Sequence, residues 1–172
     1  PSTSGCDIPL NFEYVLNTPC VTCYARTNGD WNTIGTWSST SRTGGSCGCL
    51  PDATSDVVVD TWTVYYEEHD ANAKSVWIRN DIGNGDTYFY LREGYALDVV
   101  NDFDVYQENS DENMLFYVYD DNTELNIGGD LTLYTHPTKG LDGNSDDIRF
   151  RIDDDATVNI TGNMIVDHND GD

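Results

Sequence analysis

The chain has 172 residues, 31 Asp and Glu against eight Lys and Arg, and a formal net charge of −23 at pH 7. So few cations exclude nucleic acid as a partner, because a phosphate backbone is bound through Lys and Arg. The sequence has no apolar run of membrane-spanning length, so we expect no insertion into a bilayer. The length is sufficient for one core, and a surface this acidic repels itself unless cations screen or bind it.

All five cysteines lie in the first fifty residues, in a region rich in Gly, Ser and Thr: Cys6, Cys20, Cys23, Cys47 and Cys49. Such clustering is typical of a disulfide-stapled region in an oxidising compartment, and we predict a disulfide-stapled cap over residues 1–55. The alternative is a zinc site, in which the Cys20-x-x-Cys23 and Cys47-x-Cys49 pairs supply four thiolates. The pattern does not give the pairing, and an odd cysteine remains.

Residues 56–86 follow the cysteine-rich region and alternate less regularly than the rest. Val57-Val58-Val59, Trp62/Val64 and Val76/Ile78 are typical of short strands. The Ile-Gly-Asn-Gly-Asp run at 82–86 predicts a strong turn. We therefore expect a first, irregular coil here.

The sequence after residue 86 repeats itself three times. Each repeat carries three apolar pairs of period two, separated first by an acidic or Gly-bearing turn and then by a Gly/Asn/Asp corner. The pairs are Phe89/Leu91, Leu97/Val99 and Phe103/Val105, then Phe116/Val118, Leu125/Ile127 and Leu131/Leu133, then Phe150/Ile152, Val158/Ile160 and Met164/Val166. Period two indicates strands, and self-similarity of this length is the signature of a solenoid.

Each repeat therefore predicts one coil of three short strands. We predict an all-β chain folded as a right-handed parallel β-helix (β-solenoid) with the cysteine-rich cap at its N-terminal end. The predicted boundaries are 1–55 for the cap and 56–172 for the solenoid, divided into the irregular coil 56–86 and the repeats 87–113, 114–147 and 148–172. Because the chain opens at Pro1 without Met, we expect a processed end or an excised piece, with coils continuing beyond residue 172.

Stacking of the repeats makes specific positions meet. Phe89, Phe116 and Phe150 would form one interior column. The outward residues Asp98, Asn126 and Asn159 would form a ladder of side-chain hydrogen bonds, which we expect Asp98 to interrupt; the alternative is three ordinary solvated positions. We expect Gly, Asn and Asp at the corners because they tolerate a left-handed backbone.

Acidic residues gather in the turns of the repeats and suggest calcium. Residues 142–147 place oxygen ligands at alternate positions around a Gly, as at the start of a calcium loop, without the Glu that would complete it. Two further acidic turns occupy equivalent corners of adjacent repeats, where stacked carboxylates would repel each other unless a cation bridges them. The candidate ligands are Asp142, Asn144, Asp146, Asp120, Asp121, Asp153 and Asp154. The alternative is that these side chains extend into water and bind nothing.

The sequence offers no catalytic constellation. His69, His136 and His168 fall in loops without a shared motif, and no nucleophile or metalloprotease motif is present. Arg149 and Arg151 alternate on one strand and could neutralise an acidic sugar, as in a polysaccharide lyase, or pair with nearby carboxylates. We predict no enzymatic activity and no catalytic residue.

Aromatic residues are numerous, with eleven Tyr and four Trp. Tyr90, Tyr117 and Trp77 fall at outward strand positions and could form one surface for stacking against sugar rings. The alternative is that the rings cover the edges of the core or stack on one another, since Tyr88, Tyr90, Tyr117 and Tyr119 belong to neighbouring coils.

Residues 29–64 resemble a known type of secreted protein. Gly29-Asp30-Trp31, Gly35-Thr36-Trp37, Pro51 and Asp56–Val59 resemble the G-x-W, G-T-W and P-x-x-x-D-x-V-x-V segment that opens large secreted surface proteins of Bacteroidota, including gliding-motility adhesins and other cargo of type IX secretion. The runs Ile127–Leu133 and Thr161–Val166 resemble their later coils. The resemblance implies an exported protein with a parallel β-helix, located outside the cell or on its surface, and it maps no catalytic residue.

These observations predict a non-enzymatic extracellular structural or adhesive protein, part of a cell-surface adhesin or filament. The expected partners are another copy of the chain, cell-envelope proteins or an external glycan. The alternative is a glycan-binding or polysaccharide-cleaving module on the same scaffold.

Overall fold

The computed structural model describes residues 20–46, 48, 50–66, 69–80, 85–107, 113–135 and 148–168. Within them the chain is all-β, with one three-residue 3-10 helix, η1 (Ile34–Thr36). The strands are β1 (Thr22–Ala25), β2 (Gly29–Asp30), β3 (Trp37–Ser38), β4 (Asp56–Asp60), β5 (Thr63–Tyr66), β6 (Ala71–Ala73), β7 (Ser75–Asn80), β8 (Thr87–Leu91), β9 (Ala96–Val99), β10 (Phe103–Gln107), β11 (Met114–Val118), β12 (Glu124–Ile127), β13 (Leu131–Thr135), β14 (Ile148–Ile152), β15 (Thr157–Ile160) and β16 (Met164–His168). No helix in this part of the chain is long and apolar enough to cross a membrane.

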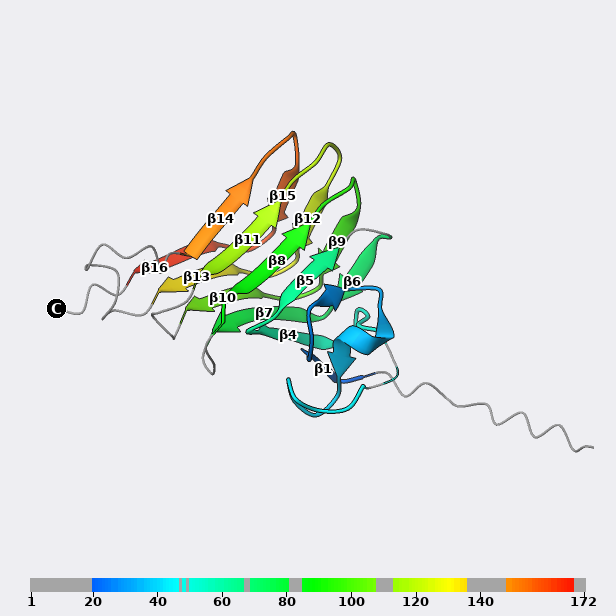
Figure 1. Cartoon of the computed structure of the whole chain (residues 1–172). Coiled ribbons are helices and arrows are strands. Elements are labelled where there is room, and N and C mark those ends of the chain that lie inside the picture. Colours follow the sequence, from blue (N-terminus) through cyan, green and yellow to red (C-terminus); the bar gives the residue numbers. More distant parts are fainter. Residues whose placement is uncertain are drawn as a thin grey trace, which may run out of the picture.

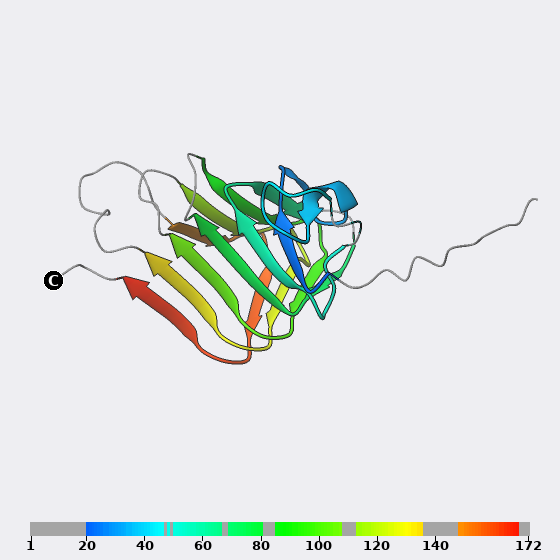
Figure 2. The same ribbon diagram turned by 90° about the horizontal axis from the view of Figure 1, so that it is seen from below.

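The strands form three sheets, and from β4 onward successive strands along the chain belong to sheets A, B and C in turn. Sheet A contains β1, β4, β7, β10, β13 and β16, sheet B contains β2, β5, β8, β11 and β14, and sheet C contains β6, β9, β12 and β15 (Figure 1). Every pairing inside these sets is parallel, and only β3 joins sheet A in antiparallel fashion, beside β1. Figure 2 shows β1 (blue) and β16 (red) at opposite ends of the stack. The prediction of an all-β chain with parallel sheets is confirmed.

From β5 onward the chain consists of four units, each with one strand of sheet B, one of sheet C and one of sheet A. Each strand pairs with the strand three places further along, so successive units lie against each other in register. The register matches the repeat read from the sequence: Phe116 lies opposite Phe89 on one side and Phe150 on the other. In the middle of the stack alternate residues of a strand are buried, as in β8, where Thr87, Phe89 and Leu91 point inward.

Phenylalanine rings fill the centre of the core. Phe116 is fully buried, and its ring centroid lies 5.6 Å from that of Phe89, 4.9 Å from that of Phe150 and 4.8 Å from that of Phe103. Phe103 comes from sheet A, whereas the other three belong to sheet B, so these contacts also join two sheets. The predicted phenylalanine column is therefore present.

The corner glycines are needed for a reason that differs from the predicted one. Left-handed backbone occurs in the turns that follow β8, β11 and β14, for example at Gly94 (φ 77°) and Asp120 (φ 76°). The corner glycines Gly128 and Gly162 do not have it. A Cβ on Gly128 would lie 2.2 Å from the carbonyl oxygen of Val100 in the preceding unit, and one on Gly162 would meet backbone in the same way. These corners require Gly because stacked units bring two backbones into contact.

Two tryptophans close the N-terminal end of the core. Trp31 and Trp37 are both buried, with ring centroids 5.1 Å apart, and the Nε1 of Trp37 donates to the carbonyl of Trp31 (2.8 Å). Trp31 also packs edge-on against Phe89, at 6.2 Å. The two Gly-x-Trp runs noted in the sequence therefore supply packing at the end of the stack.

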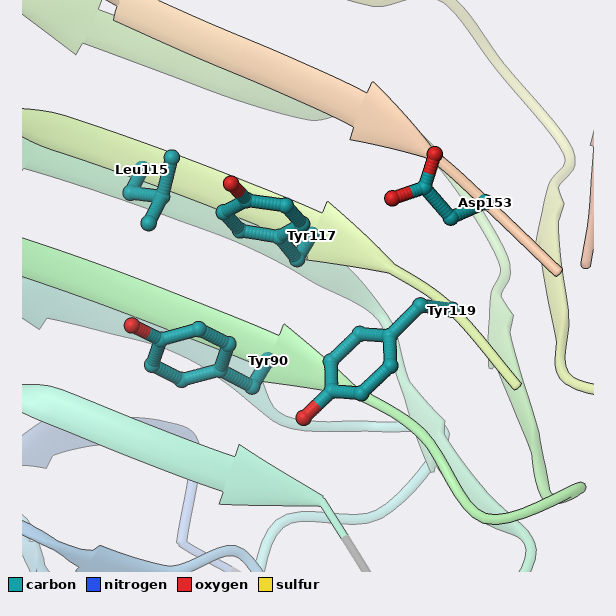
Figure 3. A pocket seen from close by; sticks show the side chains of 5 residues that line it. All are labelled: Tyr90, Leu115, Tyr117, Tyr119 and Asp153. Carbon is teal, nitrogen blue, oxygen red and sulfur yellow. The ribbon is translucent and has the colours of Figure 1, made fainter.

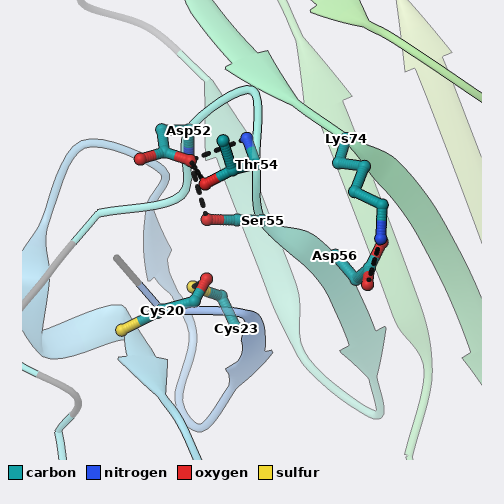
Figure 4. Close-up of polar contacts among 7 residues, drawn as sticks. All are labelled: Cys20, Cys23, Asp52, Thr54, Ser55, Asp56 and Lys74. Carbon is teal, nitrogen blue, oxygen red and sulfur yellow. Dashed lines mark hydrogen bonds and ion pairs between the residues drawn. The ribbon is translucent and has the colours of Figure 1, made fainter. Parts of the chain in front are cut away.

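Cys20 and Cys23 lie beside this end and are both buried (Figure 4). Within the described residues no disulfide joins the two, and the Cys23 thiol donates to the Cys20 carbonyl, 3.9 Å from Sγ. Cys6, Cys47 and Cys49 lie outside the described residues. Disulfide or zinc bonding that involves these three cysteines therefore stays a prediction.

A compact polar turn leads into β4 (Figure 4). The Asp52 carboxylate accepts hydrogen bonds from the backbone N–H and hydroxyl of Thr54 and from the hydroxyl of Ser55, and these bonds lower the pKa of Asp52. Just beyond it, the Nζ of Lys74 forms an ion pair with Asp56 at 3.0 Å. The turn fixes the point at which the chain enters sheet A.

Candidate binding surface

A polar ladder runs along the outer face of sheet C. The Nδ2 of Asn126 donates to Oδ1 of Asp98 (2.9 Å), and the Nδ2 of Asn159 donates to Oδ1 of Asn126 (2.8 Å). The ladder predicted from the repeat is therefore confirmed, but Asp98 does not interrupt it. Asp98 serves as the terminal acceptor, because a carboxylate can accept an amide proton as well as a carboxamide can.

We expect the stability of the fold to depend on whether the central residue of this ladder, Asn126, is an amide or an acid. Asn126→Ala removes two hydrogen bonds and should lower the free energy of unfolding by about 1–2 kcal/mol. Asn126→Asp should lower it further at pH 7, because a second carboxylate then faces Asp98. Chemical denaturation at pH 7 and at pH 4 measures both effects. Equal stability of the two variants at pH 7 would show that the ladder contributes no specific interaction.

Carboxylates at the corners bond to the backbone of the adjoining unit. Asp102 accepts from the N–H of Asp130 (2.9 Å), and Asp130 accepts from the N–H of Asn163 (2.7 Å). In the same way, Asp70 accepts from the backbone N–H of Ala96, Asp86 from that of Asn113 and Asp120 from that of Glu93. Part of the acidic composition therefore has a structural use, as acceptors for N–H groups that the sheets leave unpaired.

The structure gives the candidate calcium ligands different surroundings. Asp120 accepts from the Glu93 N–H, Asp153 forms an ion pair with Arg151 at 2.5 Å, and Asp121 and Asp154 are exposed. Asp142, Asn144 and Asp146 lie outside the described residues. Among the residues described, no three His, Cys, Asp or Glu side chains are grouped so that they could hold a metal ion. Calcium binding remains a prediction of the sequence.

A melting experiment tests that prediction and locates the ion. Calcium bound to the folded chain should raise Tm, and excess chelator should lower it again. Loss of the shift in Asp142→Asn/Asp146→Asn would place the ion in that turn, whereas loss in Asp121→Asn/Asp154→Asn would place it at the stacked corners. A Tm that responds to neither calcium nor chelator would remove the prediction.

Tyrosines form a column on the outer face of sheet B. Tyr65, Tyr90 and Tyr117 occupy paired positions on β5, β8 and β11, with centroids 5.6 and 5.9 Å apart and planes 10° and 17° apart. Guanidinium groups lie over its two ends, with Arg92 5.7 Å from the Tyr65 centroid and Arg151 5.5 Å from that of Tyr117. Each stacked pair contributes about 0.5–1.5 kcal/mol beyond its buried area. Burial first, and then the neighbouring tyrosines, raises the pKa of Tyr90.

A hollow of about 310 Å³ opens beside this column. Its lining residues are Tyr90, Leu115, Tyr117, Tyr119 and Asp153 (Figure 3). The Tyr119 ring stands nearly perpendicular to its neighbours, at 85° to Tyr90 and 81° to Tyr117. Its hydroxyl accepts a hydrogen bond from Arg92 at 2.9 Å, which holds the ring in place. We refer to these five residues as the tyrosine hollow.

Trp77 does not belong to this surface, so the predicted grouping with Tyr90 and Tyr117 is wrong. Trp77 lies on β7 in sheet A, and its Nε1 donates to Asp104 at 2.9 Å. Partial burial raises the pKa of Asp104. The alternation of apolar and polar residues shows which positions face outward, but it does not show to which sheet a strand belongs. Tyr90 and Tyr117 face outward from sheet B, whereas Trp77 faces outward from sheet A.

The remaining chemically active candidates are not brought together. His69 is exposed and packs edge-on near Tyr95, at 6.4 Å, whereas His136 and the side chain of His168 lie outside the described part. Arg151 binds Asp153 and Tyr117, which is the carboxylate pairing given as the alternative for this residue. Arg149 is exposed on β14.

Comparison with known proteins adds no assignment. No family model, no curated protein and no solved structure matches the chain.

Proposed function

We propose that this chain is a segment of a non-enzymatic, extracellular structural or adhesive protein, part of a cell-surface adhesin or filament. In this proposal the segment is a right-handed parallel β-helix, in which each unit is one coil of three short strands. A cysteine-rich cap over residues 1–55 closes its N-terminal end with disulfides that involve Cys6, Cys47 or Cys49.

The observation that carries the proposal is the three-strand cycle, which continues without a break from β4 to β16. Backbone pairing joins every unit to its neighbours, and the phenylalanine column, the sheet C ladder and the tyrosine column each join three of the four units. Because stability then comes from nearest neighbours, such a stack is rigid and can be lengthened unit by unit. Rigidity and length are what a filament or an adhesin stalk requires.

Two features support an extracellular location. The cysteines are clustered as in proteins of oxidising compartments. Residues 29–64 and the later repeats resemble secreted surface proteins of Bacteroidota. Mass spectrometry of the native protein under non-reducing conditions would test the disulfides, and five free thiols would contradict the stapled cap.

The proposal is tested on the cells that produce the protein. Antibodies raised against the folded chain should label intact cells, and an external protease should remove that label. Cells that lack the gene should attach less to the surface on which they normally grow. Labelling that appears only after lysis would contradict the surface location, and release of new reducing ends from a polysaccharide would contradict the non-enzymatic assignment.

A further inference from the structure

We propose that the tyrosine hollow binds a neutral pyranose unit of an external polysaccharide. The inference rests on the proposed adhesive function, because it names the chemistry that the adhesive surface would hold. It concerns Tyr90, Leu115, Tyr117, Tyr119 and Asp153, with Arg151 at the rim.

The hollow combines apolar walls with a few polar groups. Leu115 and the rings of Tyr117 and Tyr119 supply apolar and aromatic surface, all from β11 and the residue that follows it. The Tyr hydroxyls and the Asp153 carboxylate add hydrogen-bonding groups at the edge (Figure 3). Pockets for small ligands are typically lined in this way, with apolar walls for affinity and few polar groups for orientation. A pyranose has C–H faces and equatorial hydroxyls that fit both.

The site is held in place before any ligand arrives. Arg151 forms an ion pair with Asp153 at 2.5 Å and also donates to the hydroxyl of Tyr117, at 3.4 Å. Arg92 holds the hydroxyl of Tyr119 in the same way, from the preceding unit. Side chains that are already fixed lose little conformational entropy when a ligand binds. Half-buried rings whose positions are fixed by residues of three units make this hollow a better candidate than isolated surface aromatics.

Charge selects a neutral sugar over an ionic one. The carboxylate of Asp153 and the guanidinium of Arg151 neutralise each other, so neither is available as an isolated charge. A uronate would approach a chain with a net charge of −23, which repels anions. A cationic ligand would meet the guanidinium of Arg151, which lies 5.5 Å from the centroid of the Tyr117 ring at the rim of the hollow.

A second hollow, of about 330 Å³, follows the sheet C ladder but is a weaker candidate. Its polar side chains are Thr161 and the three ladder residues Asp98, Asn126 and Asn159, which already bond to one another, and it contains no aromatic ring. A sugar there would have to break the ladder to gain hydrogen bonds from its amide N–H groups.

Isothermal titration tests the proposal with the hexasaccharides of glucose, xylose, mannose and galactose, and with hexagalacturonate as the acidic comparison. At least one neutral hexasaccharide should bind more tightly than hexagalacturonate. Tyr119→Ala should weaken that binding about tenfold or more, as for a central aromatic contact. Tyr119→Phe, which keeps the ring, should weaken it less. The matched control is Tyr134→Ala on sheet A, where Tyr134 packs against Tyr106 at 5.5 Å, and it should leave binding unchanged.

Three results would overturn the inference: no binding of any neutral hexasaccharide, tighter binding of hexagalacturonate, or equal loss in Tyr119→Ala and Tyr134→Ala. Melting curves of both variants should match the unaltered chain within a few degrees, which separates loss of the site from loss of the fold. Surface labelling and cell attachment are measured independently, so the adhesive function can fail or hold whatever the titration shows.

Discussion

Replacing Phe116 with Ala should lower the free energy of unfolding by about 3–5 kcal/mol, the largest effect that we expect from a single substitution. Phe116 is fully buried, and its ring meets three other phenylalanine rings from two sheets within 5.6 Å. Removing it leaves a cavity in the middle of the stack, where neighbouring units are fixed by backbone pairing and cannot close the space.

Phe150→Ala is the matched control for this prediction. Phe150 occupies the same position one unit later, but it is only partly buried because it lies in the last described unit. Its replacement should cost less than half as much as that of Phe116, measured by urea denaturation of both variants. If the two variants lost the same stability, the phenylalanine column would not be the common core of the stacked units.

Replacing Gly128 with Ala should lower the free energy of unfolding by about 1–3 kcal/mol, although the side chain gained is a single methyl group. The added Cβ would lie 2.2 Å from the Val100 carbonyl oxygen, and backbone in a paired corner has little freedom to move away. The variant should therefore separate two units at their corner and increase amide exchange there, around Val100 and Gly128.

Gly45→Ala is the control for Gly128, because no atom lies within 4 Å of the Cβ that it adds. It should change Tm little, or raise it slightly by restricting the unfolded chain. Thermal denaturation of the two variants side by side makes the comparison. Equal Tm values would mean that the corners can relax and that Gly128 is not required for close stacking.

The strands and their register could be predicted because both depend on spacing alone. Period-two apolar pairs fix which residues face inward, and the repeat fixes which unit lies next to which, as the opposition of Phe116 to Phe89 and Phe150 shows. The ladder position followed from the same reasoning. The role of Asp98 did not, because hydrogen-bond direction depends on which neighbour supplies the proton.

The candidate site could be predicted only in part. The sequence groups Tyr90, Tyr117 and Tyr119 as residues of neighbouring coils that could stack, but it does not connect Tyr65 or the guanidinium groups of Arg92 and Arg151 with them. Extending the strand register to β5 would have identified Tyr65 as a member of the column, because it lies opposite Tyr90. The positions of the Arg92 and Arg151 guanidinium groups depend on side-chain rotamers that no sequence period encodes. The sequence locates the corner glycines correctly but explains them by a left-handed backbone. They are required because stacked units bring two backbones into contact at the corners.

Electron microscopy of the native protein, as it is released from the cells that make it, tests the central claim most directly. A rigid stack of coils that serves as a stalk or filament predicts thin rods or fibres of uniform width, which react along their length with antibodies against this chain. Compact, rounded particles without extended rods would contradict a structural or adhesive rod and would leave a soluble module in its place.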